Sequence, residues 1–132
     1  MTAVPPAADP VGFQYVALRC VPRVDREEFL NVGVIVYSQA ADFLRAATRL
    51  TPQRLHALDS RLDLDAVRSA LDLVEAVCSG APAAGAAAGP SLGQRFGWLT
   101  APRSTVLQPS PIHGGLTRDP QAELDRLLHR LV

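Results

Sequence analysis

A chain of 132 residues has the length of one domain with one hydrophobic core. Apolar residues make up 48% of the chain and aromatic residues only 5%, so we expect an aliphatic core of Leu, Val and Ala. All 13 basic residues are Arg, and they balance 13 acidic residues, a neutrality that argues against binding to nucleic acid or to an anionic membrane. No apolar run reaches the roughly 18 residues that a membrane span requires.

The sequence shows neither a targeting signal nor a metal-binding motif. Residues 1–10 lack the basic segment followed by an apolar segment that marks a secretory signal, so we expect a cytoplasmic protein. Cys20 and Cys78 form no CxxC pair and the three His residues are scattered, so we expect two buried thiols, no metal and no cofactor. The mixed charges of residues 23–28 indicate a solvated connector rather than an oxygen-ligand metal site. Abundant Ala and the lack of Lys are typical of a high-GC bacterial genome.

The N-terminal part of the chain predicts three antiparallel strands. Residues 1–11 contain three prolines and little to bury, and they predict a disordered tail. Residues 12–21 alternate between two largely apolar faces, which favours a central strand that is covered on both sides. Residues 32–37 form the most strand-like run of the chain, and Gly33 within it indicates a bulge or a close backbone approach. Residues 42–48 complete a three-stranded meander.

Capping signals mark three helices after these strands. A short helix begins at residues 51–52, where a Thr precedes a Pro. A longer amphipathic helix is capped by Asp63 or Asp65 and ends at Gly80. The last helix has Asp119 as its cap and Pro at its first position. Its apolar stripe consists of Leu124, Leu127, Leu128 and Leu131.

The remaining segments complete the predicted fold. Residues 79–93 are rich in Ala, Gly and Pro and poor in large side chains, which predicts a flexible, partly disordered loop that packs poorly. A further strand is expected around residues 105–108. The chain therefore predicts one α+β domain over residues 12–132, with a small antiparallel sheet of three to five strands and two or three packed helices.

The densest group of functional side chains lies in residues 94–115. This segment holds the only Trp, two Arg, four hydroxyl side chains, two Gln and a His, and its three prolines restrict the backbone. We expect it to form one exposed, preorganised surface that binds a protein partner or an anionic group. The candidate contact residues are Arg95, Trp98, Arg103, Ser104, Gln108, Ser110 and His113.

Two kinds of small-molecule chemistry could use this segment. Arg side chains with nearby hydroxyl and imidazole donors suit a phosphate or a carboxylate. Ser104 or Ser110, with His113 and Asp119, would supply the residue types for acyl transfer. The prolines on both sides of Ser110 are unlike a nucleophile elbow, however, and they remove an amide that an oxyanion hole could use.

Several runs occur together in the order and spacing of a known family. They comprise Tyr15, Arg19 and residues 21–22, then residues 26–34, residues 95–99 and residues 101–113. The chain thereby resembles, over nearly all of residues 13–132, an uncharacterised bacterial family named domain of unknown function 3037. The resemblance implies no activity and no catalytic residue, because none is assigned to the family. It implies a partnership with HipA-like kinases, whose genes often neighbour those of the family.

These observations favour a non-enzymatic accessory or partner-binding protein that acts with a HipA-like kinase. The alternative is a small enzyme or an anion- or phosphate-binding domain that uses residues 95–115, in particular Arg103, Ser104, Ser110 and His113. Neither a membrane nor a nucleic acid is expected as a partner.

Overall fold

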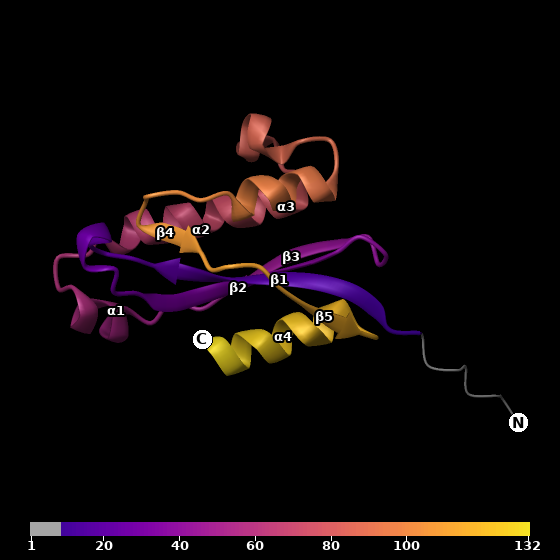
Figure 1. The fold of residues 1–132 in the computed structure, drawn as a ribbon. Helices are drawn as coiled ribbons and strands as arrows, with labels where there is room; N and C mark the ends of the chain where they lie inside the picture. The colour runs from indigo at the N-terminus through magenta and orange to yellow at the C-terminus, as the bar shows by residue number, and fades with distance from the viewer. Residues whose placement is uncertain (1–8) are drawn as a thin grey trace, which may run out of the picture.

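The computed structural model describes residues 9–132 and has three layers: a helical layer, an antiparallel sheet and a single helix (Figure 1). The architecture confirms the predicted α+β class. The strands are ordered β3–β2–β1, and both β4 and β5 lie on the far edge of β1. No helix within residues 9–132 is long and apolar enough to span a membrane. The strands are β1 Val11–Cys20, β2 Leu30–Ser38, β3 Phe43–Thr48, β4 Leu107–Pro109 and β5 His113–Thr117.

β1 is the central strand, as its two apolar faces predicted. Val16 and Leu18 enter the core beneath the helical layer, whereas Phe13 enters the core above the single helix. β2 pairs with β1 along most of its length, and β3 completes the predicted meander. β1 begins at Val11, the end of the predicted tail 1–11, whose residues 1–8 lie outside the described part of the chain.

Both predictions for Gly33 are confirmed. The register between β1 and β2 shifts just before Arg19, which leaves Val32 as the extra residue of a β-bulge. A Cβ atom at Gly33 would lie 2.9 Å from the backbone oxygen of Ala47 on β3, so a larger residue does not fit without a shift of the backbone. The bulge places Arg19 directly opposite Asn31.

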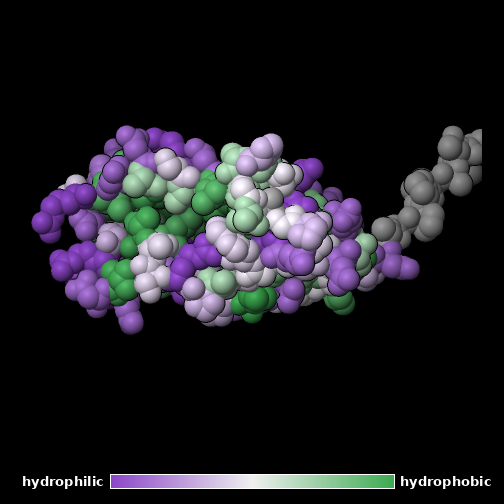
Figure 2. Space-filling view, turned by 90° about the horizontal axis from the view of Figure 1, so that it is seen from above, coloured by the Kyte–Doolittle hydropathy of each residue, from purple (hydrophilic) through white to green (hydrophobic). Residues whose placement is uncertain are grey.

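The helical layer covers what we call the upper face of the sheet (Figure 1). It consists of α2 (Leu64–Ser79), α3 (Leu92–Thr100) and a 3-10 segment (Pro82–Ala88). Asp63 caps α2 by accepting two backbone amides, and Gly80 ends it with a φ of 70°, as the sequence predicted. Figure 2, seen from above, shows apolar side chains gathered over the half of this layer where α2 begins. The buried core below includes Val16, Ile35, Val67, Leu71, Val74, Val77, Phe96 and Leu99.

Residues 79–93 include the end of α2 and the start of α3, so they are not one continuous loop, although most of their described side chains are exposed. The 3-10 segment lies on α2, and Ala84 is buried in the upper core, because small side chains allow a close approach to the helix. Ser91 then caps α3 by accepting the amide of Gln94, and the sequence analysis did not predict this helix. Flexibility of the segment stays a prediction.

A single helix, α4 (Pro120–Leu131), covers part of the lower face. Asp119 caps it by accepting two backbone amides, as predicted. Leu124 and Leu127 are each only 2% exposed and form a second, smaller core with Phe13, Val34 and Val36. Because α4 packs on β2 and β3, the lower side of β1 next to β4 and β5 lies beside the helix rather than beneath it. The short helix α1 (Pro52–Leu58) lies at the end of the sheet.

Candidate functional site

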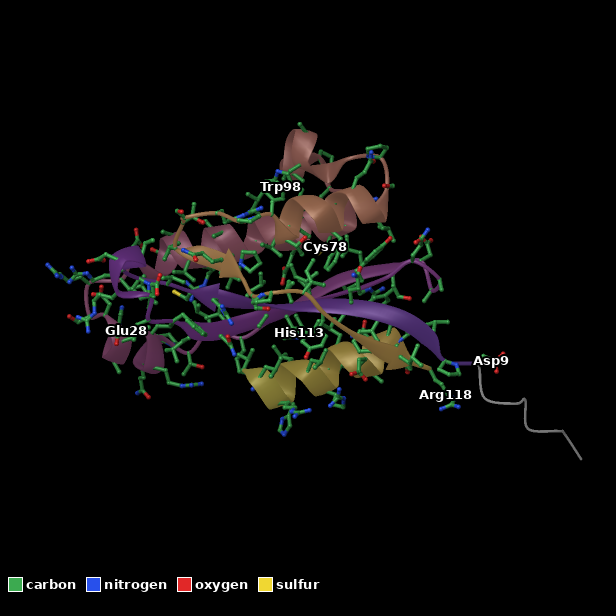
Figure 3. The ribbon with its side chains drawn as sticks, in the orientation of Figure 1. Asp9, Glu28, Cys78, Trp98, His113 and Arg118 are labelled. Atoms are coloured by element: carbon green, nitrogen blue, oxygen red, sulfur yellow. The ribbon has the colours of Figure 1, made fainter. Side chains whose placement is uncertain are left out.

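The structure distributes residues 94–115 over both faces of the sheet. Arg95 and Trp98 belong to α3 in the upper layer, whereas the ring of His113 packs on Tyr15, whose side chain faces the lower core (Figure 3). The expectation that this segment forms one continuous surface is therefore corrected. The physical reason is that α3 lies on the upper face, while the chain that follows it runs along the edge of β1 and turns alternate side chains to the lower face.

Arg95 closes the C-terminal end of α2. Its Nη1 donates to the backbone oxygen of Cys78 at 3.2 Å, and its guanidinium lies against Gly80. A cationic donor at the last carbonyls of a helix is stabilising because these groups carry partial negative charge. Its Nε is buried without a hydrogen-bond partner within the described residues. We assign Arg95 a structural role.

Trp98 and Arg103 form a separate pair at the other end of α3. The Cζ of Arg103 lies 4.5 Å from the centroid of the Trp98 ring, and its guanidinium donates to the backbone oxygens of Trp98 and Ala101. Trp98 is 38% exposed, and the neighbouring Ser104 is exposed as well. Much of the hydrogen-bonding capacity of Arg103 is thus used on the end of its own helix.

Ser110 is part of the sheet. Its hydroxyl accepts the amide of Ala17 at 2.8 Å and donates to the backbone oxygen of Pro111 at 2.9 Å, and its own amide donates to Ala17 at 2.8 Å. The hydroxyl bridges the gap between β4 and β5, where the flanking prolines cannot donate to β1. Because Ser110 is buried and these bonds engage its hydroxyl, it does not form a nucleophilic pair with His113.

A row of polar side chains crosses the lower face on three adjacent strands. Arg19 on β1 is paired in register with Gln108 on β4 and with Asn31 on β2. Directly paired residues in antiparallel strands point to the same side of a sheet and have neighbouring Cβ atoms. The amide nitrogen of Asn31 donates to the backbone oxygen of Leu131 at 3.1 Å, which places this row beside the C-terminal end of α4.

Arg19 is the charged side chain of this row. Its Cζ lies 4.2 Å from the centroid of the Phe29 ring, and it makes no ion pair with a carboxylate of the described residues. The Nε of Arg19 and the Oδ1 of Asn31 are both buried without a hydrogen-bond partner. Buried polar atoms normally have partners, so these two atoms are exceptions within the described residues, as is the Nε of Arg95.

Aromatic side chains flank the row along β1. His113 packs on Tyr15 with the ring centroids 5.2 Å apart, and Phe29 is 42% exposed. Tyr15, Arg19 and Gln108 are half-buried, and His113 is exposed. We call these five residues the open strip: Tyr15, Arg19, Phe29, Gln108 and His113. Gln108 and His113 were predicted as contact residues from the sequence, whereas Tyr15, Arg19 and Phe29 were not.

The two thiols lie on the upper side of the sheet and are not reactive groups. Burial raises the pKa of Cys20 to about 11. Burial, together with the nearby Glu75, raises the pKa of Cys78 to about 12. Both thiols therefore stay neutral at physiological pH, when a nucleophile or a metal ligand would need to be a thiolate. No cluster of His, Cys, Asp or Glu in the described part of the chain could hold a metal ion.

One family model matches this chain. Its description is a protein of unknown function (DUF3037), and the match covers residues 15–132. The chain belongs to the DUF3037 family. The match includes all three polar residues of the row on the lower face, and it assigns no activity to any of them. Searches of curated proteins and of solved structures find no significant match to the chain.

Proposed function

We propose that this DUF3037 protein is a non-enzymatic partner-binding protein whose contact surface is the open strip. Arg19 is the anchor of this surface and binds a carboxylate on the partner. The observation that carries the proposal is the state of Arg19, which is half-buried and stacked on Phe29 but has no acidic partner within residues 9–132. The guanidinium of Arg19 lies over the Phe29 ring, and a guanidinium can bind both oxygens of a carboxylate through its two Nη groups.

The composition of the open strip supports a protein partner. Tyr and Arg are enriched among the residues that carry most of the energy of protein interfaces, and stiff aromatic side chains lose little entropy when they are covered. The alternative of a Ser/His enzyme has less support, because Ser110 is used in the sheet.

The family resemblance suggests a HipA-like kinase as the partner, and the composition suggests a bacterial, cytoplasmic setting. We retain both as parts of the proposal. An acidic segment on the kinase surface would supply the carboxylate for Arg19.

The proposal is tested by calorimetric titration of the full chain into the HipA-like kinase encoded in the same genome. We expect saturable binding that Arg19→Met weakens about tenfold or more, since interface Arg residues are often worth more than about 1.4 kcal/mol. Arg118→Met is the matched control, because this exposed side chain follows β5 at the opposite end of the sheet (Figure 3). Equal binding by the wild type and Arg19→Met would overturn the open strip as the contact surface, and a wild type that does not bind would overturn the kinase as the partner.

A further inference from the structure

A cavity of about 320 Å³ lies at the end of the molecule where the connector between β1 and β2 faces the end of α1. One wall comes from residues 22–28 and the other from residues 56–61. Figure 3 shows Glu28 beside α1 at this end, and Figure 2 shows that the surface there is strongly hydrophilic. A volume of this order is at the lower end of the range for small-molecule sites.

Positive groups from both walls meet at this cavity. Arg23 and Arg26 come from the connector and Arg61 from the opposite wall, together with His56. Glu28 is the acidic residue of the first wall, and it is paired with Arg26. Three guanidinium groups and the carboxylates of Glu28 and Asp59 line the cavity, so its lining carries one more positive than negative side chain.

The pairing pattern leaves part of this positive charge available. Arg23 pairs with Asp25 at 3.5 Å, whereas Arg61 makes no ion pair within the part of the chain that the structure describes. Asp59 uses one carboxylate oxygen to accept the backbone amide of Arg61 at 2.9 Å, and its other oxygen remains an acceptor. The cavity therefore offers cationic donors together with carboxylate and hydroxyl groups that accept hydrogen bonds.

The backbone of the connector is held in an uncommon conformation at the cavity. Glu27 has a φ of 56° and a ψ of 18°, the left-handed region that costs a residue with a side chain roughly 1–2 kcal/mol. This residue ends the 3-10 turn Val24–Arg26 and lies between Arg26 and Glu28, which both line the cavity. Strained backbone of this kind is concentrated at functional sites.

We propose that this cavity binds a small phosphate monoester that carries hydroxyl groups, such as a sugar phosphate. The guanidinium groups of Arg23, Arg26 and Arg61 bind the phosphate, because two oxygens of a phosphate can accept from the planar fork of an Arg side chain. The carboxylates of Glu28 and Asp59 repel a second anionic group but accept hydrogen bonds from sugar hydroxyls. The inference stands apart from the proposed partner surface, because none of its residues belongs to the open strip.

The test is a titration of the full 15N-labelled chain with ribose 5-phosphate, inorganic phosphate and sulfate, at constant ionic strength. We expect saturable shifts of amides in residues 22–28 and 56–61, with ribose 5-phosphate binding more tightly than either inorganic anion. Arg61→Gln is expected to weaken the binding of ribose 5-phosphate at least tenfold. Arg23→Gln provides a second, independent variant, and both side chains are exposed, so the fold is expected to persist.

Two control variants separate this site from the other basic groups. Arg68→Gln changes an exposed arginine of α2 that pairs with Asp65 and does not line the cavity, and Arg19→Met changes the open strip. Both are expected to bind ribose 5-phosphate as the wild type does. Equal responses to all three probes, a response that does not saturate, or unchanged binding by Arg61→Gln and Arg23→Gln would overturn the proposal.

Discussion

The two faces of the sheet are covered in different ways. Two helices and a 3-10 segment cover the upper face. Their buried side chains form one core with those of the sheet. α4 alone covers the lower face, where Phe13 of β1 joins its core and Tyr15 and Arg19 of β1 belong to the open strip. On the upper face the Nη1 of Arg95 donates to the end of α2, whereas on the lower face Arg19 makes no ion pair within the described residues. If the proposed contact surface is correct, the upper face mainly provides stability and the lower face provides recognition.

The largest effect on stability is expected from the upper core. Phe96 is 4% exposed and stacks on Tyr37 with ring centroids 5.0 Å apart. Phe96→Ala should lower the free energy of unfolding by about 3–5 kcal/mol, because it leaves a cavity that the surrounding side chains fill only in part. Trp98→Ala is the matched control on the outside of the same helix and should cost much less. Urea denaturation measures both, and similar losses would show that the upper face is not the main core.

The lower core should respond to truncation, but less strongly. Leu127→Ala removes a side chain that is 2% exposed between α4 and β2, at an expected cost of about 2–4 kcal/mol within the range for Leu→Ala. Leu128→Ala, on the half-buried side of the same helix, should cost less. A Leu127→Ala variant that melts like the wild type would mean that α4 is a detachable element. The lower face would then have no core that stabilises the fold.

A smaller loss is expected where the edge of β1 depends on one hydroxyl. Ser110→Ala leaves the amide of Ala17 without its acceptor, at a cost of about 1–3 kcal/mol for an unsatisfied buried donor. Ser104→Ala changes an exposed hydroxyl on the same segment and should change stability little. Hydrogen exchange at Ala17 provides the readout, since its protection should fall in Ser110→Ala alone. Unchanged protection of this amide would contradict the hydrogen bond from Ala17 to the Ser110 hydroxyl.

Local signals made much of the fold predictable. The alternation of residues 12–21, the caps at Asp63 and Asp119 and the glycine at Gly80 act within a few residues, and the structure confirms them. β5 gave no such signal, because most of it is exposed and two of its residues are glycines. It is held by its register with β1, where the ring of Phe13 covers Gly115.

The candidate site was harder to predict, because it depends on tertiary packing. Gln108 and His113 attracted attention as polar residues in a dense segment, but the strand that joins them into one surface lies almost 90 residues earlier. Arg19 did carry a signal, as a charged residue within an otherwise apolar central strand. That signal could not show which side chains surround Arg19 in the fold, or that it makes no ion pair within residues 9–132.

The central claim is that Arg19 is kept for recognition rather than for stability. Urea denaturation of Arg19→Met tests it most directly, because Met keeps the apolar stem and removes the unpaired guanidinium. The account predicts a free energy of unfolding that is unchanged or raised by up to about 1 kcal/mol, as is common where a binding group is removed. A loss of about 3 kcal/mol or more, the cost expected when a buried charge network is broken, would contradict it.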